Sequence, residues 1–366
     1  MIYIVYNKFY DFARNEITIG GIQTYISDLI CIFMEMNYEV CVIQMGNEER
    51  SIEINGYTIN QYCVKARYKC EALAKRIKSE IDEKNDLVIF ATDSIAPLSV
   101  RFEKSIAIQH GISWDKPSQT PGSIAKGLLS RMKATYRIAK SLKLIHSVIC
   151  VDYNFQNWYR TQVDRVESNL VVIPNYSRVS LGKPKPSDVV NIIFARRLFW
   201  YRGTRVFVSA IKPVLDSRTN VQITIAGSGD DEQWMREQLS GYKNVKFITY
   251  RSEESLDIHQ DKHIAVVPTV GSEGTSLSLL EAMSAGCAAI ASDVGGMTNI
   301  IIDGYNGKLV PAGSVTALRL AIEQLIDDSE ERELLSSRGK ETVKAAFSYE
   351  RWAEQWKTVV HNIMMN

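Results

Sequence analysis

Short, uninterrupted apolar runs recur along the chain, and longer segments with apolar residues at helical spacing lie between many of them. The runs lack the polar alternation of a half-exposed strand, so they predict strands buried on both faces of parallel sheets. They occupy residues 1–6, 40–45, 87–90, 105–110, 147–152, 170–176, 191–195, 222–227, 245–250, 264–268 and 288–292. This alternation predicts an α/β protein with doubly wound, Rossmann-like sheets.

The alternation is interrupted at Leu181–Asp188, where the sequence LGKPKPSD is rich in proline and polar residues and is typical of a linker. A length of 366 residues also exceeds what one hydrophobic core ordinarily fills, which favours two domains. We therefore expect one domain at residues 1–180 and a second at residues 181–346. Each would hold its own Rossmann-like sheet.

Composition narrows the class of protein. Hydrophobic residues make up 45% and charged residues 23%, which is ordinary for a folded soluble protein. The 43 lysines and arginines nearly balance the 42 acidic residues, so no nucleic-acid partner is expected. The six cysteines show neither C-x-x-C pairing nor metal spacing, and no apolar stretch approaches the ~20 residues of a membrane span. Because residues 1–6 also lack the basic start of a signal peptide, we expect a cytoplasmic protein.

The densest candidate chemistry lies in Gly271–Gly296, after the apolar run 264–268. Glu273 and Glu281 lie eight positions apart there, the first in a turn and the second in a helix-like segment. In an open α/β sheet, ligands bind at the carboxyl ends of the strands, where the next helix presents unpaired N–H groups. Such amides suit a phosphate, carboxylates suit hydroxyl groups, and a sugar nucleotide has both. The donor-binding residues expected at the helix start are Gly274, Thr275, Ser276 and Leu277.

Three motifs resemble those of glycosyltransferase family 4: EGTSLSLLEAMSAG from Glu273, ASDVGG from Ala291 and DGYNG from Asp303. The resemblance extends, more weakly, over almost the whole chain. It implies the GT-B fold, in which two Rossmann-like domains face a central cleft, and a terminal helix, here residues 347–366, that crosses back onto the first domain. It also implies transfer of a sugar from a nucleotide-sugar donor with retention of anomeric configuration, without a metal or a cofactor.

The implied enzyme is hexosyltransferase-like, and its acceptor would be a glycan or a lipid-linked saccharide in surface polysaccharide biosynthesis. Two alternatives stay open: a nucleotide-sugar epimerase on the same fold, and a non-catalytic subunit that only binds sugar nucleotides. An NAD-dependent dehydrogenase is disfavoured, because ITIGGIQ after the first strand is not the G-x-G-x-x-G of a dinucleotide site.

A cluster of arginines follows the apolar run 191–195. The matching pattern in family 4 is G-R-L, a short spacer and K-G. Arg197 matches the arginine of this pattern, Arg202 replaces its lysine, and Arg196 stands in place of its glycine. We expect Arg197 and Arg202 to bridge the donor diphosphate, whose negative charge grows as the sugar leaves. The alternative is a set of surface arginines in a loop.

The resemblance also assigns roles to the two glutamates. Glu281 would accept hydrogen bonds from the ribose hydroxyls, and Glu273 would face hydroxyls of the transferred sugar. Thr275 and Ser276 stand where the family has phenylalanine and glycine, so the preference for a particular donor does not carry over. Gly227, in a short G-S-G turn, would lie near the nucleotide base.

The first domain supplies further candidates, of which Gly20 and Gly21 are expected to bind the donor. Gly20 and Gly21 follow the first strand, where family 4 has a G-G that lines the cleft; the alternative is an ordinary turn. His110 ends a strand, and family 4 often contacts the transferred sugar from such a position; the alternative is a histidine packed at the base of a loop. Its imidazole would supply a hydrogen-bond donor. Trp114 and Asp115 are expected to meet the acceptor.

Residues 116–151 contain seven lysines and arginines and no acidic residue. Within 123–143, a predicted helix has a basic face and an opposite apolar stripe. The basic face holds Lys126, Lys133, Arg137 and Lys140, and the stripe holds Leu128, Leu129, Met132, Tyr136, Ala139 and Leu142. Two interpretations stay open: the solvated face of an ordinary domain helix, and a surface for anionic lipid or a lipid diphosphate acceptor at the inner face of the cell membrane.

Overall fold

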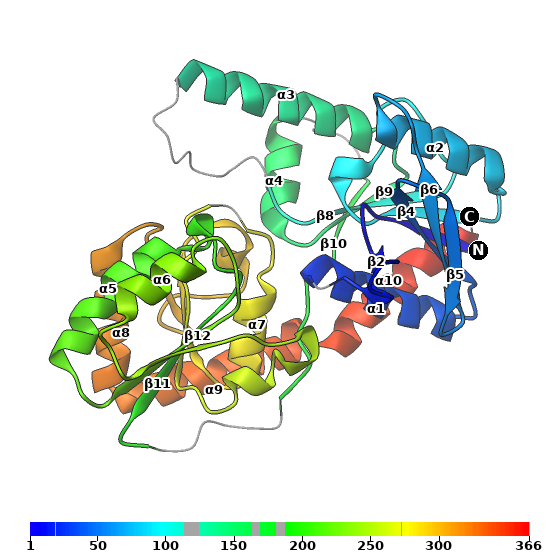
Figure 1. Ribbon diagram of the computed structural model, residues 1–366. Coiled ribbons are helices and arrows are strands. Elements are labelled where there is room, and N and C mark those ends of the chain that lie inside the picture. The colour runs from blue at the N-terminus through cyan, green and yellow to red at the C-terminus, as the bar shows by residue number, and fades with distance from the viewer. Residues whose placement is uncertain (19, 113–123, 163–168, 181–186, 272, 366) are drawn as a thin grey trace. The chain divides into compact units, whose positions relative to one another are not determined.

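The computed structural model divides into two compact units (Figure 1). It describes residues 1–18, 20–112, 124–162, 169–180, 187–271 and 273–365. The first unit comprises Met1–His110, Thr120–Ile173 and Ala353–Asn366, and the second comprises Gly111–Gln119 and Pro174–Trp352. The chain thus passes into the second unit after Ile173, slightly before the boundary expected at residue 180. Most of the expected linker lies outside the described residues.

The first unit is built on an open sheet. Its strands are β1 (Ile2–Val5), β4 (Val40–Gly46), β5 (Arg50–Ile54), β6 (Tyr57–Cys63), β7 (Leu87–Phe90), β8 (Ser105–Gln109), β9 (Ser147–Cys150) and β10 (Leu170–Val172). Their order is β10-β9-β8-β7-β1-β4-β6-β5, and neighbouring strands run parallel except in the β5–β6 hairpin. A small antiparallel pair, β2 (Tyr10–Asp11) and β3 (Glu16–Ile17), precedes the first helix. The strand order reverses between β1 and β7.

Helices α1 (Gly21–Glu35), α2 (Lys69–Glu80), α3 (Ile124–Leu142) and α4 (Tyr153–Gln162) complete the first unit. The last helix, α10 (Tyr349–Met365), begins in the second unit and contributes its residues from Ala353 onward to the first. There the side chain of Trp356 is fully buried, and its indole N–H donates to the hydroxyl of Tyr25 at 2.9 Å. The end of the chain is therefore part of the core of the first unit.

The second unit has a parallel sheet of β11 (Val190–Ala195), β12 (Val221–Ala226), β13 (Val245–Ile248), β14 (Ile264–Val267), β15 (Ala288–Ser292) and β16 (Lys308–Val310). The order is β13-β12-β11-β14-β15-β16, the doubly wound arrangement of a Rossmann sheet. Its helices are α5 (Thr204–Ser217), α6 (Glu232–Leu239), α7 (Leu277–Ser284), α8 (Val315–Asp327) and α9 (Ser329–Ala346). Every residue of β14 and β15 is buried, as the apolar runs predict.

Three features of the described chain are additional to those that the apolar runs predict: the β2–β3 pair, the β5–β6 hairpin and the edge strand β16. The hairpin turns at Asn55 and Gly56, whose φ angles of 50° and 84° lie in the left-handed region that such a two-residue turn requires. An Asn-Gly pair between two partly apolar runs is the sequence signal for this hairpin. Polar residues interrupt β5 and β6, which explains why a search for apolar runs overlooks them.

Candidate functional site

The strand order of the second unit reverses between β11 and β14, and the loops after these strands carry the candidate residues. Arg196 directly follows β11, and Thr269 and Glu273 follow β14. Because the two strands are parallel neighbours, their carboxyl ends lie at the same edge of the sheet. The candidate site is therefore at the switch point of the sheet, where open α/β proteins bind ligands.

Glu273 lies at the centre of a hydrogen-bonded cluster. Nη2 of Arg196 donates to both carboxylate oxygens of Glu273, at 2.9 and 2.8 Å. Nη1 of Arg202 lies 2.5 Å from Oε1, and the hydroxyl of Thr269 donates to Oε2 at 2.7 Å. A carboxylate offers about four lone-pair positions, so these contacts occupy Glu273 fully.

The charges of this cluster are shielded from water. The exposed fraction of the side chain is 4% for Arg196, 13% for Glu273 and 19% for Arg202. Burial alone would raise the pKa of Glu273, but the charges of Arg196 and Arg202 outweigh it and lower that pKa to about 2. Glu273 is therefore ionised at neutral pH. Two guanidinium groups and one carboxylate leave a net charge of +1, which favours an anionic ligand.

Two members of the cluster, Arg196 and Thr269, have no role in the expectations from the sequence, and Arg196 is the charged one. Burial lowers its pKa, while the neighbouring charge of Glu273 raises it. Its Nε is buried and has no hydrogen-bond partner among the described residues, so one donor remains for a water molecule or a ligand atom. An arginine that directly follows a buried strand needs a buried counterion. The position of Arg196 after β11 is therefore the sequence signal for its role.

Close backbone contacts hold the Glu273 loop. The N–H of Gly296 donates to the carbonyl oxygen of Glu273 at 2.7 Å. A Cβ on Gly295, which has a φ of 54°, would lie 2.0 Å from the same oxygen. A Cβ on Gly203, with a φ of 86°, would lie 1.8 Å from the carbonyl oxygen of Pro268. Glycine is thus required at these places, because any side chain would push the loops of the cluster apart.

Helix α7 begins directly behind this loop. Leu277 is its first residue, and the side chain of its N-cap residue, Ser276, caps no N–H group. Thr275 and Ser276 are buried, with exposed fractions of 3% and 2%. The structure therefore brings the expected amides next to Glu273, through Gly274, while burial restricts what their hydroxyl groups can reach.

Glu281 lies one turn into α7, because the helix begins at Leu277. Burial raises the pKa of Glu281 to about 7, against the effect of a hydrogen bond with Ser255 that lowers it. Burial and then the charge of Glu281 raise the pKa of Tyr250, which the charge of Arg196 lowers. Tyr250 thus lies near both Glu281 and Arg196.

Arg197 and Gly227 have different surroundings from the cluster. Arg197 is exposed, and its guanidinium carbon lies 5.9 Å from the ring centroid of Phe199. A Cβ on Gly227, with a φ of 133°, would lie 2.2 Å from the carbonyl oxygen of Arg196. Close packing of the two loops explains this glycine, and its contact with a nucleotide base stays a prediction.

In the first unit, His110 follows β8 and packs near the switch point between β1 and β7. Its Nε2 lies 2.9 Å from the carbonyl oxygen of Ala91, and its ring meets that of Tyr25 edge-on, with centroids 5.5 Å apart. Burial lowers the pKa of His110 to about 4, so the ring is neutral at pH 7. A carbonyl can only accept, so Nε2 carries the proton and Nδ1 is an acceptor. The ring thus offers an acceptor where the sequence analysis expected a donor.

The remaining candidates that the sequence places in the first domain are less constrained. Gly20 is the N-cap residue of α1, and Gly21 is its first residue. A Cβ on Gly20 would lie 2.4 Å from Oε1 of Gln23, at the end of a flexible side chain. Trp114 and Asp115 lie outside the described residues. The ligand contacts of all four stay predictions.

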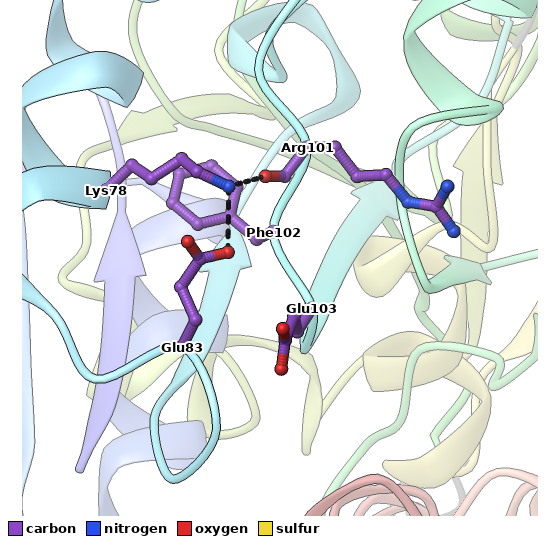
Figure 2. A pocket seen from close by; sticks show the side chains of 5 residues that line it. All are labelled: Lys78, Glu83, Arg101, Phe102 and Glu103. Carbon is purple, nitrogen blue, oxygen red and sulfur yellow. Dashed lines mark hydrogen bonds and ion pairs between the residues drawn. The ribbon is translucent and has the colours of Figure 1, made fainter.

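A surface pocket of the first unit lies away from these residues. Figure 2 shows its lining, which consists of Lys78, Glu83, Arg101, Phe102 and Glu103. The lining comes from α2 and from segments that precede β7 and β8, so the pocket lies toward the amino ends of these strands. Nζ of Lys78 donates to Oε2 of Glu83 at 2.8 Å and to the carbonyl oxygen of Arg101 at 2.5 Å. Its lysine is therefore already satisfied within the protein.

Two kinds of feature are absent from the part of the chain that the structure describes. No helix there combines the length and the apolarity that crossing a membrane requires. No three His, Cys, Asp or Glu side chains gather there as a metal site requires. Independence from metals and cofactors stays a prediction.

The sequence of the chain is similar to those of known glycosyltransferases. Residues 180–342 match the family of group 1 glycosyl transferases. The chain is 29% identical over 215 residues to the phosphatidyl-myo-inositol mannosyltransferase of Mycobacterium leprae, which covers 56% of this chain and 55% of that protein. It is also 29% identical over 200 residues to a D-inositol 3-phosphate glycosyltransferase of Corynebacterium glutamicum, covering 52% and 47%. The chain thus spans about half the length of these curated relatives.

Solved structures establish the fold. Sucrose-phosphate synthase from Thermosynechococcus elongatus has a TM-score of 0.79, covering 100% of this chain and 99% of that chain at 18% identity. Anabaena Alr3699/HepE in complex with UDP has a TM-score of 0.71, covering 99% of both chains at 15% identity. The chain has the GT-B fold. The expected architecture of two Rossmann-like units is confirmed.

Proposed function

We propose that the chain is a retaining, metal-independent glycosyltransferase of family 4 that moves a sugar from a nucleotide-sugar donor to a glycan or lipid-linked acceptor. The observation that carries this proposal is the positively charged cluster of Arg196, Arg202 and Glu273 beside the uncapped start of α7. A diphosphate at this place would meet guanidinium groups and helix amides together. The hydroxyl groups of the same ligand would meet Glu273 and Glu281.

The arginines would act on the leaving group. Transfer breaks the bond between the anomeric carbon and a phosphate oxygen and forms a bond from that carbon to the acceptor oxygen, whose proton passes to the leaving diphosphate. Negative charge grows on the diphosphate, so fixed cations lower the barrier. The side chain of Arg202 is 19% exposed and can reach a ligand, whereas that of Arg196, at 4%, stays buried. Arg197, which is exposed, would supply a second contact.

Glu273 would exchange partners when the donor binds. In the free protein its carboxylate already accepts from Arg196, Arg202 and Thr269. If Arg202 turns to the diphosphate, Oε1 gains a free position for a hydroxyl group of the transferred sugar. Arg196 and Thr269 would keep the carboxylate in place during this exchange. The proposed role in sugar binding is thus compatible with a fully paired carboxylate in the free state.

Names of relatives suggest the first ligands to try. The HepE structure is a complex with UDP, and the pneumococcal O-GlcNAc transferase GtfA is a complex with UDP and GlcNAc. The relative from Mycobacterium leprae is named for transfer of mannose to phosphatidyl-myo-inositol. We therefore start from UDP-sugars and GDP-mannose as donors, and we place the reaction in surface polysaccharide biosynthesis, on a cytoplasmic protein that meets the inner face of the cell membrane.

The test is a product analysis with nucleotide sugars labelled in the sugar, after a thermal-shift screen has selected donors that stabilise the protein. We expect free nucleoside diphosphate and a labelled acceptor, and NMR of the product should show the anomeric configuration of the donor. Arg202→Gln should abolish this product, whereas Glu253→Gln, at an exposed position of the same unit, should not change it. A labelled nucleotide sugar with an inverted carbon would favour the epimerase instead. Binding without turnover across a broad acceptor panel would favour the non-catalytic subunit.

A further inference from the structure

Helix α3 carries two separate apolar faces. The first packs on the unit: Ile138, Ser141 and Leu142 are buried, with exposed fractions of 8%, 2% and 1%. At about 100° per residue, these three positions point to one side of the helix. The second face lies roughly 140° away around the same axis. It consists of Leu128, Leu129, Met132 and Tyr136.

The second face is exposed. The exposed fractions are 59% for Leu128, 56% for Leu129, 59% for Met132 and 69% for Tyr136. No residue from Leu128 to Arg137 is buried. The apolar stripe expected from the sequence is therefore divided between two faces, because Leu142 belongs to the packed face and these four side chains belong to the exposed one. Four adjacent large apolar side chains in water mark a surface that binds something.

Basic residues border the exposed apolar face. Lys133 and Lys140 lie on one edge of the arc, roughly 20–40° beyond its last apolar position, and Arg131 lies on the other edge. All three are exposed, and residues 116–151 contain no acidic residue. Lysine and arginine can extend their stems along an apolar surface and keep the charge at its rim. An apolar stripe between two basic rims is the pattern of a helix that lies in the headgroup region of a bilayer.

We propose that this face of α3 binds the surface of an anionic lipid bilayer, with Leu128, Leu129, Met132 and Tyr136 inserted among the acyl chains and the basic rims on the headgroups. A second copy of the chain fits less well, because a two-fold contact through this face would bring its basic rims against each other. Binding to a membrane does not depend on the proposed glycosyl transfer, so it can be measured without donor or acceptor.

The experiment uses the full chain and two kinds of vesicle, one of phosphatidylcholine alone and one rich in phosphatidylglycerol. We expect the protein to co-sediment with the anionic vesicles at low salt and to dissociate as the salt concentration rises. Lys133→Gln/Lys140→Gln should weaken partition roughly 25-fold, since each lysine near such a surface contributes about fivefold. Leu128→Gln/Met132→Gln should weaken partition into the vesicles by roughly tenfold or more, because two apolar side chains no longer insert among the acyl chains.

Matched controls lie on exposed helix positions of the second unit. Leu320→Gln, at a leucine that is 53% exposed, and Lys344→Gln should leave partition unchanged. All variants change exposed side chains, and thermal unfolding should show that they fold like the parent. Equal sedimentation of the α3 variants and the parent, equal binding to both kinds of vesicle, or no binding at low salt would each overturn the proposal. The proposal would also be overturned if the parent protein did not bind vesicles but formed a dimer, and if Leu128→Gln/Met132→Gln dissociated that dimer.

Discussion

Glu273 and Glu281 lie eight residues apart, the first in a loop and the second in the helix that follows it. Both are shielded from water, yet their pKa values depart from the ordinary value of a glutamate in opposite directions. The pKa of Glu273 is lowered to about 2, and that of Glu281 is raised to about 7. Burial acts on both carboxyl groups in the same sense. The difference comes from the neighbours, because Glu273 contacts two guanidinium groups while Glu281 has a hydrogen bond with Ser255.

This contrast assigns different chemistry to the two carboxylates. Glu273 is a permanent anion whose lone pairs hold Arg196, Arg202 and Thr269 in position. Glu281 changes charge near neutral pH and, among the described residues, has no guanidinium partner that would fix it as an anion. A group of this kind can bind ligand hydroxyls through either protonation state, as acceptor or as donor. In the proposed transferase, the first organises the phosphate site, and the second reads the ribose.

Glu273→Gln should have the largest effect. The substitution leaves two buried guanidinium groups without their counterion, so we expect the free energy of unfolding to fall by about 3–5 kcal/mol. In the proposed reaction the rate should fall by roughly a hundredfold or more, because Arg202 loses the contact that positions it. Urea unfolding and initial rates measure the two effects. Glu253→Gln, at an exposed glutamate of the same unit, is the control, and equal unfolding of both variants would break the contrast.

Arg196→Gln tests the cause of the low pKa of Glu273. It removes the largest charge that opposes burial, together with two of the hydrogen bonds of the carboxylate. The pKa of Glu273 should rise toward its ordinary value, and the free energy of unfolding should fall by about 3 kcal/mol. Acid unfolding followed by circular dichroism should therefore begin at a higher pH. Arg197→Gln changes the exposed neighbour and should leave the acid transition in place; a shift of equal size would refute the assignment to Arg196.

The two glutamates also predict stability changes in different pH windows. Glu273 has a folded pKa of about 2, below its ordinary 4.5, so its stabilisation is present above pH 4.5 and is lost as the pH falls toward 2. Glu281 has a folded pKa of about 7, above 4.5, so its stabilisation is present below pH 4.5 and is lost as the pH rises to 7.

The glutamine of Glu281→Gln cannot ionise, so this variant should not lose stability as the pH rises to 7. We expect the variant to match the parent near pH 4 and to exceed its free energy of unfolding at pH 8 by up to about 3 kcal/mol. Guanidinium unfolding at both pH values checks this expectation. If the variant were no more stable than the parent at pH 8, ionised Glu281 would not destabilise the folded protein. The contrast between the two carboxylates would then fail.

The sequence locates both glutamates because their spacing and the preceding apolar strand are local properties. It does not predict which one is ionised, since the decisive neighbours are distant. Arg196 lies 77 residues before Glu273 and reaches it only because β11 and β14 are adjacent in the sheet, with β12 and β13 on the far side of β11. Strand order of this kind is not contained in hydrophobic periodicity.

Helix α3 shows the same limit in another form. Its apolar positions predict a helix and place it within a few residues, but two arcs of the helix are apolar, and periodicity cannot tell which arc faces the sheet. The contact with the unit selects Ile138 and Leu142 and leaves Leu128 and Met132 in water. The expected acceptor contacts of Trp114 and Asp115 rest on their place in the sequence alone, because the structure does not describe these two residues.

Ser255→Ala should give the smallest effect and tests the Glu281 side of the contrast. The hydrogen bond of Ser255 is the contact that lowers the pKa of Glu281 against burial, so its loss should raise that pKa further above 7. We expect a rise of roughly half a unit to one unit, which is the range for one hydrogen bond to a carboxylate. The backbone carbonyl oxygen of Ser255, which accepts from Nδ1 of His259 at 2.6 Å, is unchanged by the substitution.

The midpoint of the pH-dependent loss of stability near pH 7 measures the shift. The matched control is Ser240→Ala, because the hydroxyl of Ser240 donates to the carbonyl oxygen of Glu237. A midpoint that falls would mean that the hydroxyl stabilises the protonated carboxyl group, and Glu281 would then resemble a hydrogen-bonded acid more than a buried anion.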